Sequence, residues 1–124
     1  MKTTTFNATI TSVSLSIADH GALVGWLTLK DATGEQCFGG FSLFVEDEDY
    51  RFRSRMNFRN YTGLWIVRCC EVVGTHTWEG LVGKNCRVYR DDRNTIRGIG
   101  HIIEDKTFWP GVEFKAFEEM DPPK

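Results

Sequence analysis

The chain has 124 residues, of which 41% are hydrophobic, 13% aromatic and 26% charged, and its formal net charge is −2. This length predicts a single domain, residues 1–124, with a core that needs no disulfide bonds. The slightly acidic balance argues against a protein that binds a long polyanion over its whole surface, so any basic site must be local. No apolar leader and no stretch of about 18 apolar residues occurs, which predicts a cytoplasmic protein without a membrane span.

The first strands are predicted by alternation of apolar and polar side chains. Residues 3–18 alternate in two different phases, which indicates either a strand with a bulge or two short strands that meet near Thr11 and Ser12. A turn is expected at residues 18–21. Residues 22–31 then alternate in a way that suits a strand covered on both faces.

A hairpin turn at residues 31–35 leads into a third predicted strand, residues 36–45. The pair Gly39 and Gly40 interrupts its alternation. Such a pair indicates a bulge, a bend or a close approach to the backbone by another group. The three strands together predict an antiparallel meander.

Residues 63–74 predict the main helix. Apolar side chains recur at helical spacing on one face. They are Trp65, Ile66, Cys69, Cys70 and Val73. Arg68 and Glu71 are then expected to point away from the core, and Gly74 stands where a left-handed C-terminal cap belongs.

The C-terminal part predicts a short helical turn capped by Thr75 or Thr77 and then a β-hairpin over residues 84–103 that turns at residues 91–94. The tail, residues 104–124, is expected to pack as an irregular arm or a short strand. The order of elements predicts an α+β fold, in which a small antiparallel sheet of meander and C-terminal hairpin packs against one main helix.

The four cysteines do not form a metal-binding pattern. They are Cys37, Cys69, Cys70 and Cys86. No CxxC pair occurs and only three histidines are present, so we expect neither a metal site nor another cofactor. Free thiols that pack as small apolar side chains are the expected state of these residues.

Motifs of catalysis are missing from the chain: it contains no GxSxG, HExxH, Walker A or GxGxxG sequence. Acid–histidine neighbours such as Asp19 and His20 are more typical of solvated turns than of catalytic pairs. The sequence therefore predicts a protein that is not an enzyme.

The stretch YRFRSRMNFRNY, residues 50–61, combines aromatic rings with basic side chains. If it is a strand, Phe52 and Phe58 face the core and four arginines face outward. These arginines are Arg51, Arg53, Arg55 and Arg59. Arginine grips phosphate and aromatic rings stack on bases, so this face is a candidate binding surface. Alternatively, it is a solvated strand face neutralised by the acidic residues 46–49.

A second candidate region combines His101 and Lys106 with Phe108 and Trp109, and it suits the rim of a ligand or partner site. Alternatively, the two aromatic rings close one end of the core. Other candidate binding residues are His20, Trp26, Phe38 and Arg97.

Four segments, ADHGALVGWLTL, CFGGFSL, VVGTHTWEGLVGKNCRV and IRGIGHIIEDKTFWP, resemble in the same order a set of small uncharacterised phage and prophage accessory proteins. The resemblance excludes residues 45–60 and both ends of the chain. It implies a phage origin and no enzymatic activity. Its recurring positions are Asp19, His20, Gly21, Phe38, Gly39, Gly40, Trp78, Gly83, Lys84, Gly100, His101, Asp105 and Lys106.

By analogy with other small phage proteins, the resemblance implies a counter-defence role in the host cytoplasm. The first expectation is an anti-CRISPR-like inhibitor that binds and blocks a host defence complex. The alternative is a sponge that sequesters a cyclic nucleotide signal, for which a homo-oligomer with shared pockets would be suitable. A third alternative is an accessory factor in phage DNA replication or recombination that contacts single strands. The net charge of −2 ranks this alternative last.

Overall fold

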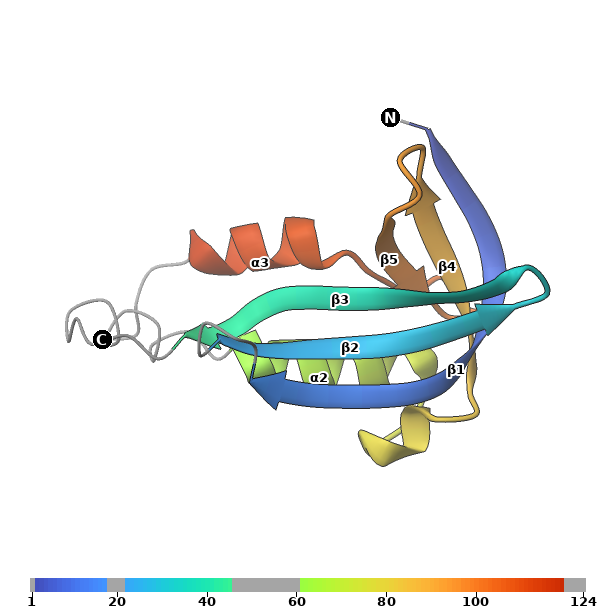
Figure 1. The fold of residues 1–124 in the computed structure, drawn as a ribbon. Helices are drawn as coiled ribbons and strands as arrows, with labels where there is room; N and C mark the ends of the chain where they lie inside the picture. The colour runs from blue at the N-terminus through green and yellow to red at the C-terminus, as the bar shows by residue number, and fades with distance from the viewer. Residues whose placement is uncertain (1, 18–21, 46–60, 120–124) are drawn as a thin grey trace.

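The computed structural model describes residues 2–17, 22–45 and 61–119. The elements in chain order are β1 (Thr3–Ile17), β2 (Ala22–Asp31), β3 (Gly34–Val45), α2 (Tyr61–Val73), the 3-10 helix η1 (Glu79–Leu81), β4 (Asn85–Asp91), β5 (Ile96–Gly100), β6 (Thr107–Phe108) and α3 (Pro110–Glu118). The predicted α+β fold is confirmed: a small antiparallel sheet packs against one main helix, α2 (Figure 1).

The sheet has six antiparallel strands in the order β3-β2-β1-β4-β5-β6. One half of the sheet contains β2 and β3, and the other contains β4, β5 and β6. β1 belongs to both halves, because Thr3–Thr9 pair with β4 and Thr9–Ile17 pair with β2. Figure 1 shows β1 curving from one half into the other, which brings β3 near β5.

The two hairpin ends of the curled sheet are joined by side chains. The amide of Gln36 in β3 donates to the carbonyl oxygen of Asn94, which lies in the β4–β5 turn. Arg90 of β4 donates to the Gln36 side-chain oxygen at 3.4 Å. These contacts hold the sheet in a partly closed, barrel-like shape.

The predicted bulge in β1 is confirmed, because the register with β2 shifts between Ile10 and Ser12. The shift lets both Ile10 and Val13 face the core, while Ser12 and Ser14 are exposed. At the same point β1 exchanges backbone hydrogen bonds with the segment after η1: Ile10 N–H donates to Lys84 O, and Gly83 N–H donates to Ile10 O. The bulge is therefore where β1 passes from one half of the sheet to the other.

Aromatic side chains from both ends of the chain meet in the core. Trp65 of α2 is fully buried, 5.2 Å from the ring of Phe38 in β3 and 5.7 Å from that of Phe108 in β6. Full burial of a large apolar side chain contributes about 1.5–3 kcal/mol. Since α2 and β6 contribute to the same cluster, the helix and the C-terminal strand stabilise each other.

The helix boundaries follow from local chemistry. α2 begins at Tyr61, two residues before the predicted start, and its predicted apolar face is the buried one. It ends where Gly74 adopts a φ of +97°, and the N–H groups of Gly74 and Thr75 both donate to Cys70 O. Thr77 Oγ1 accepts the Gly80 N–H at 2.9 Å, so this threonine stabilises the turn that follows from one residue before the N-cap of η1, Trp78.

The predicted hairpin forms, but its second strand is shorter than expected. β5 ends at Gly100 and not at Ile103, so this boundary was wrong. The reason is local: Nδ1 of His101 accepts the N–H groups of Ile103 and Glu104 at 3.0 and 2.8 Å, which turns the chain into a loop.

The tail is also more regular than predicted, because it forms β6 and the helix α3. Pro110 occupies the first position of α3, where its fixed φ suits a helix and its missing N–H costs nothing. The Glu113 carboxylate reaches back to accept the Trp109 N–H at 3.0 Å and so satisfies a donor at the helix start. The short strand expected as the alternative to an irregular arm is therefore present as β6, whereas the helix α3 was not predicted.

The predicted turn at residues 18–21 and residues 50–60 of the predicted strand lie outside the described residues, and Tyr61, the last residue of that stretch, begins α2. Neither α2 nor α3, the helices of the described part, has the length and hydropathy to cross a membrane.

Candidate functional site

The predicted binding residues fall in different parts of the fold. Arg51, Arg53, Arg55, Arg59 and His20 lie outside the described residues. The remaining six occupy four places: Phe38 is in the core, His101 and Lys106 are in the loop after β5, Arg97 and Trp109 are beside α3, and Trp26 is on the outer face of β2.

Phe38 is fully buried. Its ring packs against Trp65 and lies 6.4 Å from Phe108, edge-on. Its role in this structure is therefore in the core, and it offers no surface to a ligand.

His101 and Lys106 hold their own loop in place. His101 Nδ1 accepts two backbone N–H groups, and the His101 N–H donates to Lys106 O at 2.9 Å. Lys106 Nζ lies 3.0 Å from Glu104 Oε2. The hydrogen bond from Lys106 lowers the pKa of the Glu104 carboxyl, so this carboxyl group is ionised at neutral pH. These contacts give both residues a structural task.

The outer face of β1, β2 and β3 carries the most accessible aromatic ring among the predicted residues. Trp26 is 37% exposed, and it lies opposite Ser14 of β1 and Gly39 of β3. On the same face, two residues further along β2, Thr28 lies between Ser12 of β1 and Cys37 of β3. We call this surface the Trp26 face; its residues are Ser12, Ser14, Trp26, Thr28, Cys37 and Gly40.

Polar groups of the Trp26 face are small and uncharged. Ser12 Oγ donates to Thr28 Oγ1 at 2.8 Å, and Thr28 Oγ1 lies 4.0 Å from Cys37 Sγ. Ser14 and Cys37 are exposed beside the Trp26 ring. The face therefore offers one large aromatic surface surrounded by hydroxyl groups.

Three glycines relieve close contacts around Trp26, and one of them, Gly40, allows the indole to lie close to β3. A Cβ on Gly40 would meet the Trp26 ring at 2.5 Å, and one on Gly39 would meet Gly25 O at 2.1 Å. A Cβ on Gly25 would meet Trp65 Nε1 at 2.4 Å on the inner side. Gly39 and Gly40 also have positive φ values of 135° and 79°. The close approach that the glycine pair predicts is thus made by the Trp26 ring at Gly40 and by the backbone of Gly25 at Gly39.

All four cysteines are free thiols, as predicted, but Cys37 is exposed. Cys69 and Cys86 are fully buried, and Cys70 is 8% exposed. Burial raises the pKa of the Cys86 thiol to about 12 and that of Cys69 well above its ordinary value. The described residues contain no group of three or more histidine, cysteine and acidic side chains that could hold a metal ion.

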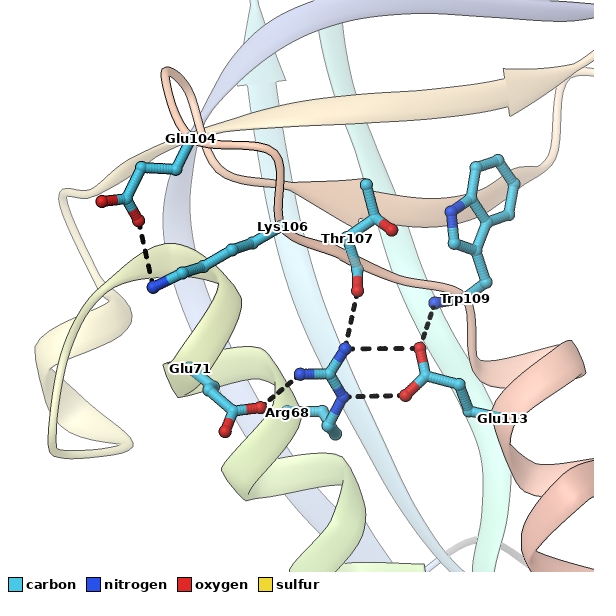
Figure 2. A network of polar contacts seen from close by, with 7 residues as sticks. All are labelled: Arg68, Glu71, Glu104, Lys106, Thr107, Trp109 and Glu113. Atoms are coloured by element: carbon cyan, nitrogen blue, oxygen red, sulfur yellow. Dashed lines mark hydrogen bonds and ion pairs between the residues drawn. The ribbon is translucent and has the colours of Figure 1, made fainter.

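A cluster around Arg68 was missed by the sequence analysis, which expected this side chain to point away from the core. Arg68 Nε donates to Glu113 Oε1 at 2.7 Å, and Nη2 donates to Thr107 O at 2.6 Å. Glu71 is a third partner. Figure 2 shows that the cluster joins α2, β6 and α3. Thr107 and Glu113 lie 39 and 45 residues from Arg68 in sequence, so no local pattern could indicate these two partners.

Comparisons of this chain with protein-family models, with curated proteins and with solved structures find no match.

Proposed function

We propose that the protein binds single-stranded nucleic acid through the Trp26 face and serves phage DNA replication or recombination as an accessory factor. The observation that carries the proposal is an exposed tryptophan on the outer face of β2 and β3, in a sheet of this particular connectivity. The phage part of the proposal rests on the sequence resemblance alone.

The connectivity supports this class of ligand. A meander, a helix and a hairpin, with the first strand shared between two halves of a curled sheet, is the arrangement of the oligonucleotide/oligosaccharide-binding (OB) fold. OB folds bind their ligands across strands 2 and 3 and the adjoining loops. Trp26 lies on that part of the sheet.

The chemistry of the face supports bases as the groups that bind there. Each base stacked on an aromatic side chain contributes about 1–3 kcal/mol, and every base has a face that can stack. The hydroxyls of Ser12, Ser14 and Thr28 add hydrogen-bonding groups beside the ring. Because this face is uncharged, we expect stacking to outweigh phosphate contacts and the affinity to fall only gently with salt.

The counter-defence function, which was the first expectation from the resemblance, becomes the second candidate, because the Trp26 face is a small surface suited to a flat ligand. An interface that blocks a large protein complex usually buries about 800 Å² on each partner.

Fluorescence anisotropy with a labelled single strand tests the proposal. The change Trp26→Ala should weaken binding by about 5- to 150-fold, which corresponds to the stacking energy of one base. Trp26→Phe keeps an aromatic surface and should retain most of the affinity. Melting temperatures of both variants show whether the fold is intact.

Val67→Ala is the matched control, since Val67 is 57% exposed on α2, away from this face. It should bind like the wild type. Absence of binding by the wild type, or equal affinity of folded Trp26→Ala, would contradict the proposal. A duplex of the same sequence should bind more weakly, because its bases are already stacked and paired.

A further inference from the structure

A second surface, on the other side of β3, has features that the Trp26 face does not share. A groove of about 510 Å³ lies beside the start of α3. Its walls come from β1, β3, β4, β5 and α3: Thr3, Phe41, Asp91, Arg97, Trp109 and Val112. The volume is within the range of small-molecule sites. We call it the Arg97 groove.

Arg97 is held in the groove by a buried carboxylate. Its Nε donates to Asp91 Oδ2 at 2.7 Å, and the Asp91 side chain is only 1% exposed. Asp91 Oδ1 in turn accepts the N–H groups of Arg93 and Thr95 at 2.9 and 3.0 Å. The guanidinium is therefore oriented by a carboxylate that is itself fixed to the backbone.

The terminal nitrogens of Arg97 remain available. The side chain is 50% exposed, and within the described part of the chain it donates hydrogen bonds only through Nε. A guanidinium oriented in this way can offer its two remaining nitrogens to a phosphate.

The side chain of Trp109, which also lines this groove, is held in place by its neighbours. Its ring lies 5.0 Å from that of Tyr89 and covers Gly98, where a Cβ would meet the indole at 2.8 Å. Its backbone N–H is bound by Glu113, and Figure 2 shows the indole directed away from the Arg68 cluster. The groove thus combines a fixed aromatic ring with a fixed cation.

We propose that the Arg97 groove binds a nucleoside monophosphate, with the phosphate on Arg97 and the base against Trp109. Phe41 and the exposed Val112 supply the apolar contacts that a base needs. A single phosphate fits better than a polyphosphate, because the Asp91 carboxylate beside Arg97 repels further negative charge. The site is separate from the Trp26 face and does not depend on the function proposed for it.

Calorimetric titration of the protein with adenosine monophosphate and cyclic adenosine monophosphate tests this site. Arg97→Gln should weaken binding by about 10- to 100-fold, because it removes charged hydrogen bonds to the phosphate. The matched control is Arg93→Gln, an exposed arginine of the β4–β5 turn that does not line the groove. Trp26→Ala should bind the nucleotide like the wild type, which separates this site from the Trp26 face.

The change Arg97→Gln also leaves the buried Asp91 carboxylate without its partner. A second pair of variants therefore tests nucleotide binding without disturbing Asp91. Val112 is 68% exposed, so both Val112→Glu and Val112→Gln should fold. Glutamate places a negative charge in the groove and should abolish nucleotide binding, whereas glutamine should weaken it only slightly.

Competition distinguishes the two sources of such a phosphate. If a 5′-phosphorylated oligothymidylate displaces the nucleotide and the unphosphorylated one does not, the ligand is the end of a strand. If neither oligothymidylate displaces the nucleotide, the ligand is a free nucleotide. Either of these two results supports a contact between Arg97 and a phosphate. The proposal is overturned if the wild type binds neither nucleotide, or if Arg97→Gln and Val112→Glu bind as tightly as their controls.

Discussion

Trp26 and Gly40 form a single packing unit on the outer face of the sheet. The ring occupies the space that a side chain at Gly40 would need, and Gly40 has a φ of +79°, which other residues adopt at a cost. The exposure of Trp26 was not predictable from alternation, which suited a strand covered on both faces. The glycine pair, however, did indicate that something approaches the backbone of β3.

Gly40→Ala should therefore destabilise the protein by about 1–3 kcal/mol, from backbone strain and displacement of the indole. Urea unfolding measures the loss. Gly111→Ala is the control, because Gly111 has no positive φ and its Cβ would enter open space. That change should be neutral or stabilise by up to about 1 kcal/mol. Equal stabilities of the two variants would show that the Trp26–Gly40 contact is not formed.

At the scale of elements, α3 is attached to α2 by the ion pair of Arg68 with Glu113 and by the ring contact of Tyr61 with Phe114. Arg68 and Glu113 are 24% and 29% exposed, and their hydrogen bonds are charge-assisted. Arg68→Met and Glu113→Gln should each cost about 1–3 kcal/mol. The double variant should cost clearly less than the sum, with a coupling energy of at least about 0.5 kcal/mol by urea unfolding.

Glu71→Gln is the control for the double-mutant cycle of Arg68 and Glu113. Glu71 also contacts Arg68, but its side chain is 56% exposed, so its loss should change stability by less than about 1 kcal/mol. Strict additivity of Arg68→Met and Glu113→Gln would mean that α3 is held by its aromatic contacts alone.

The β4–β5 turn gives the protein a defined response to acid. The Thr95 N–H and then the Arg97 guanidinium hold the pKa of the Asp91 carboxyl below its usual value. In the unfolded chain this carboxyl titrates near pH 4. The contribution of the Asp91 carboxylate to the free energy of unfolding is therefore fully present above about pH 4. It is lost as the pH falls through the pKa that this carboxyl has in the folded protein, which is lower.

Asp91→Asn should accordingly lower the free energy of unfolding by a constant amount between about pH 5 and 7. Below about pH 4 the difference from the wild type should shrink, as urea unfolding at several pH values would reveal. A difference that stays unchanged at the acidic end would show that Asp91 keeps no favourable charge interaction in the fold.

The elements that the sequence predicted correctly are those defined by local periodicity. The meander and α2 repeat their apolar residues at spacings of two and of three to four, and Gly74 marks the helix end. The end of β5 and the start of α3 depend instead on single side chains, His101 and Glu113, that bind backbone groups nearby. Histidine and glutamate are also common in loops, so the sequence did not indicate that these two side chains set the end of β5 and the start of α3.

At the scale of the whole molecule, the shape depends on one strand that pairs on both sides. The sequence predicted a meander and a hairpin, but not that Thr3–Thr9 of β1 pair with β4. That pairing joins segments about 80 residues apart, and no local pattern specifies it. It curls the sheet, brings β3 to β5 and exposes the Trp26 face on the outside.

The same curl separates the residues that the sequence analysis grouped together. His101 and Lys106 stabilise a loop, whereas Trp109 lies with Arg97 beside α3 and Trp26 lies on another surface. Proximity in sequence was therefore a poor guide to the composition of a site, although the chosen residues in the described part of the chain, apart from Phe38, are at least partly exposed.

Amide NMR spectra recorded during titration with an oligothymidylate of about 12 nucleotides, a length within the range of single-strand sites of OB folds, test whether the Trp26 face binds single strands. We expect the largest shifts at the indole N–H of Trp26 and at the amides of Ser14, Thr28 and Gly40. The amides of Val67 and its neighbours on α2 should not move. Unchanged spectra, or shifts confined to α2 and the loop after β5, would contradict the assignment of the Trp26 face as the nucleic-acid site.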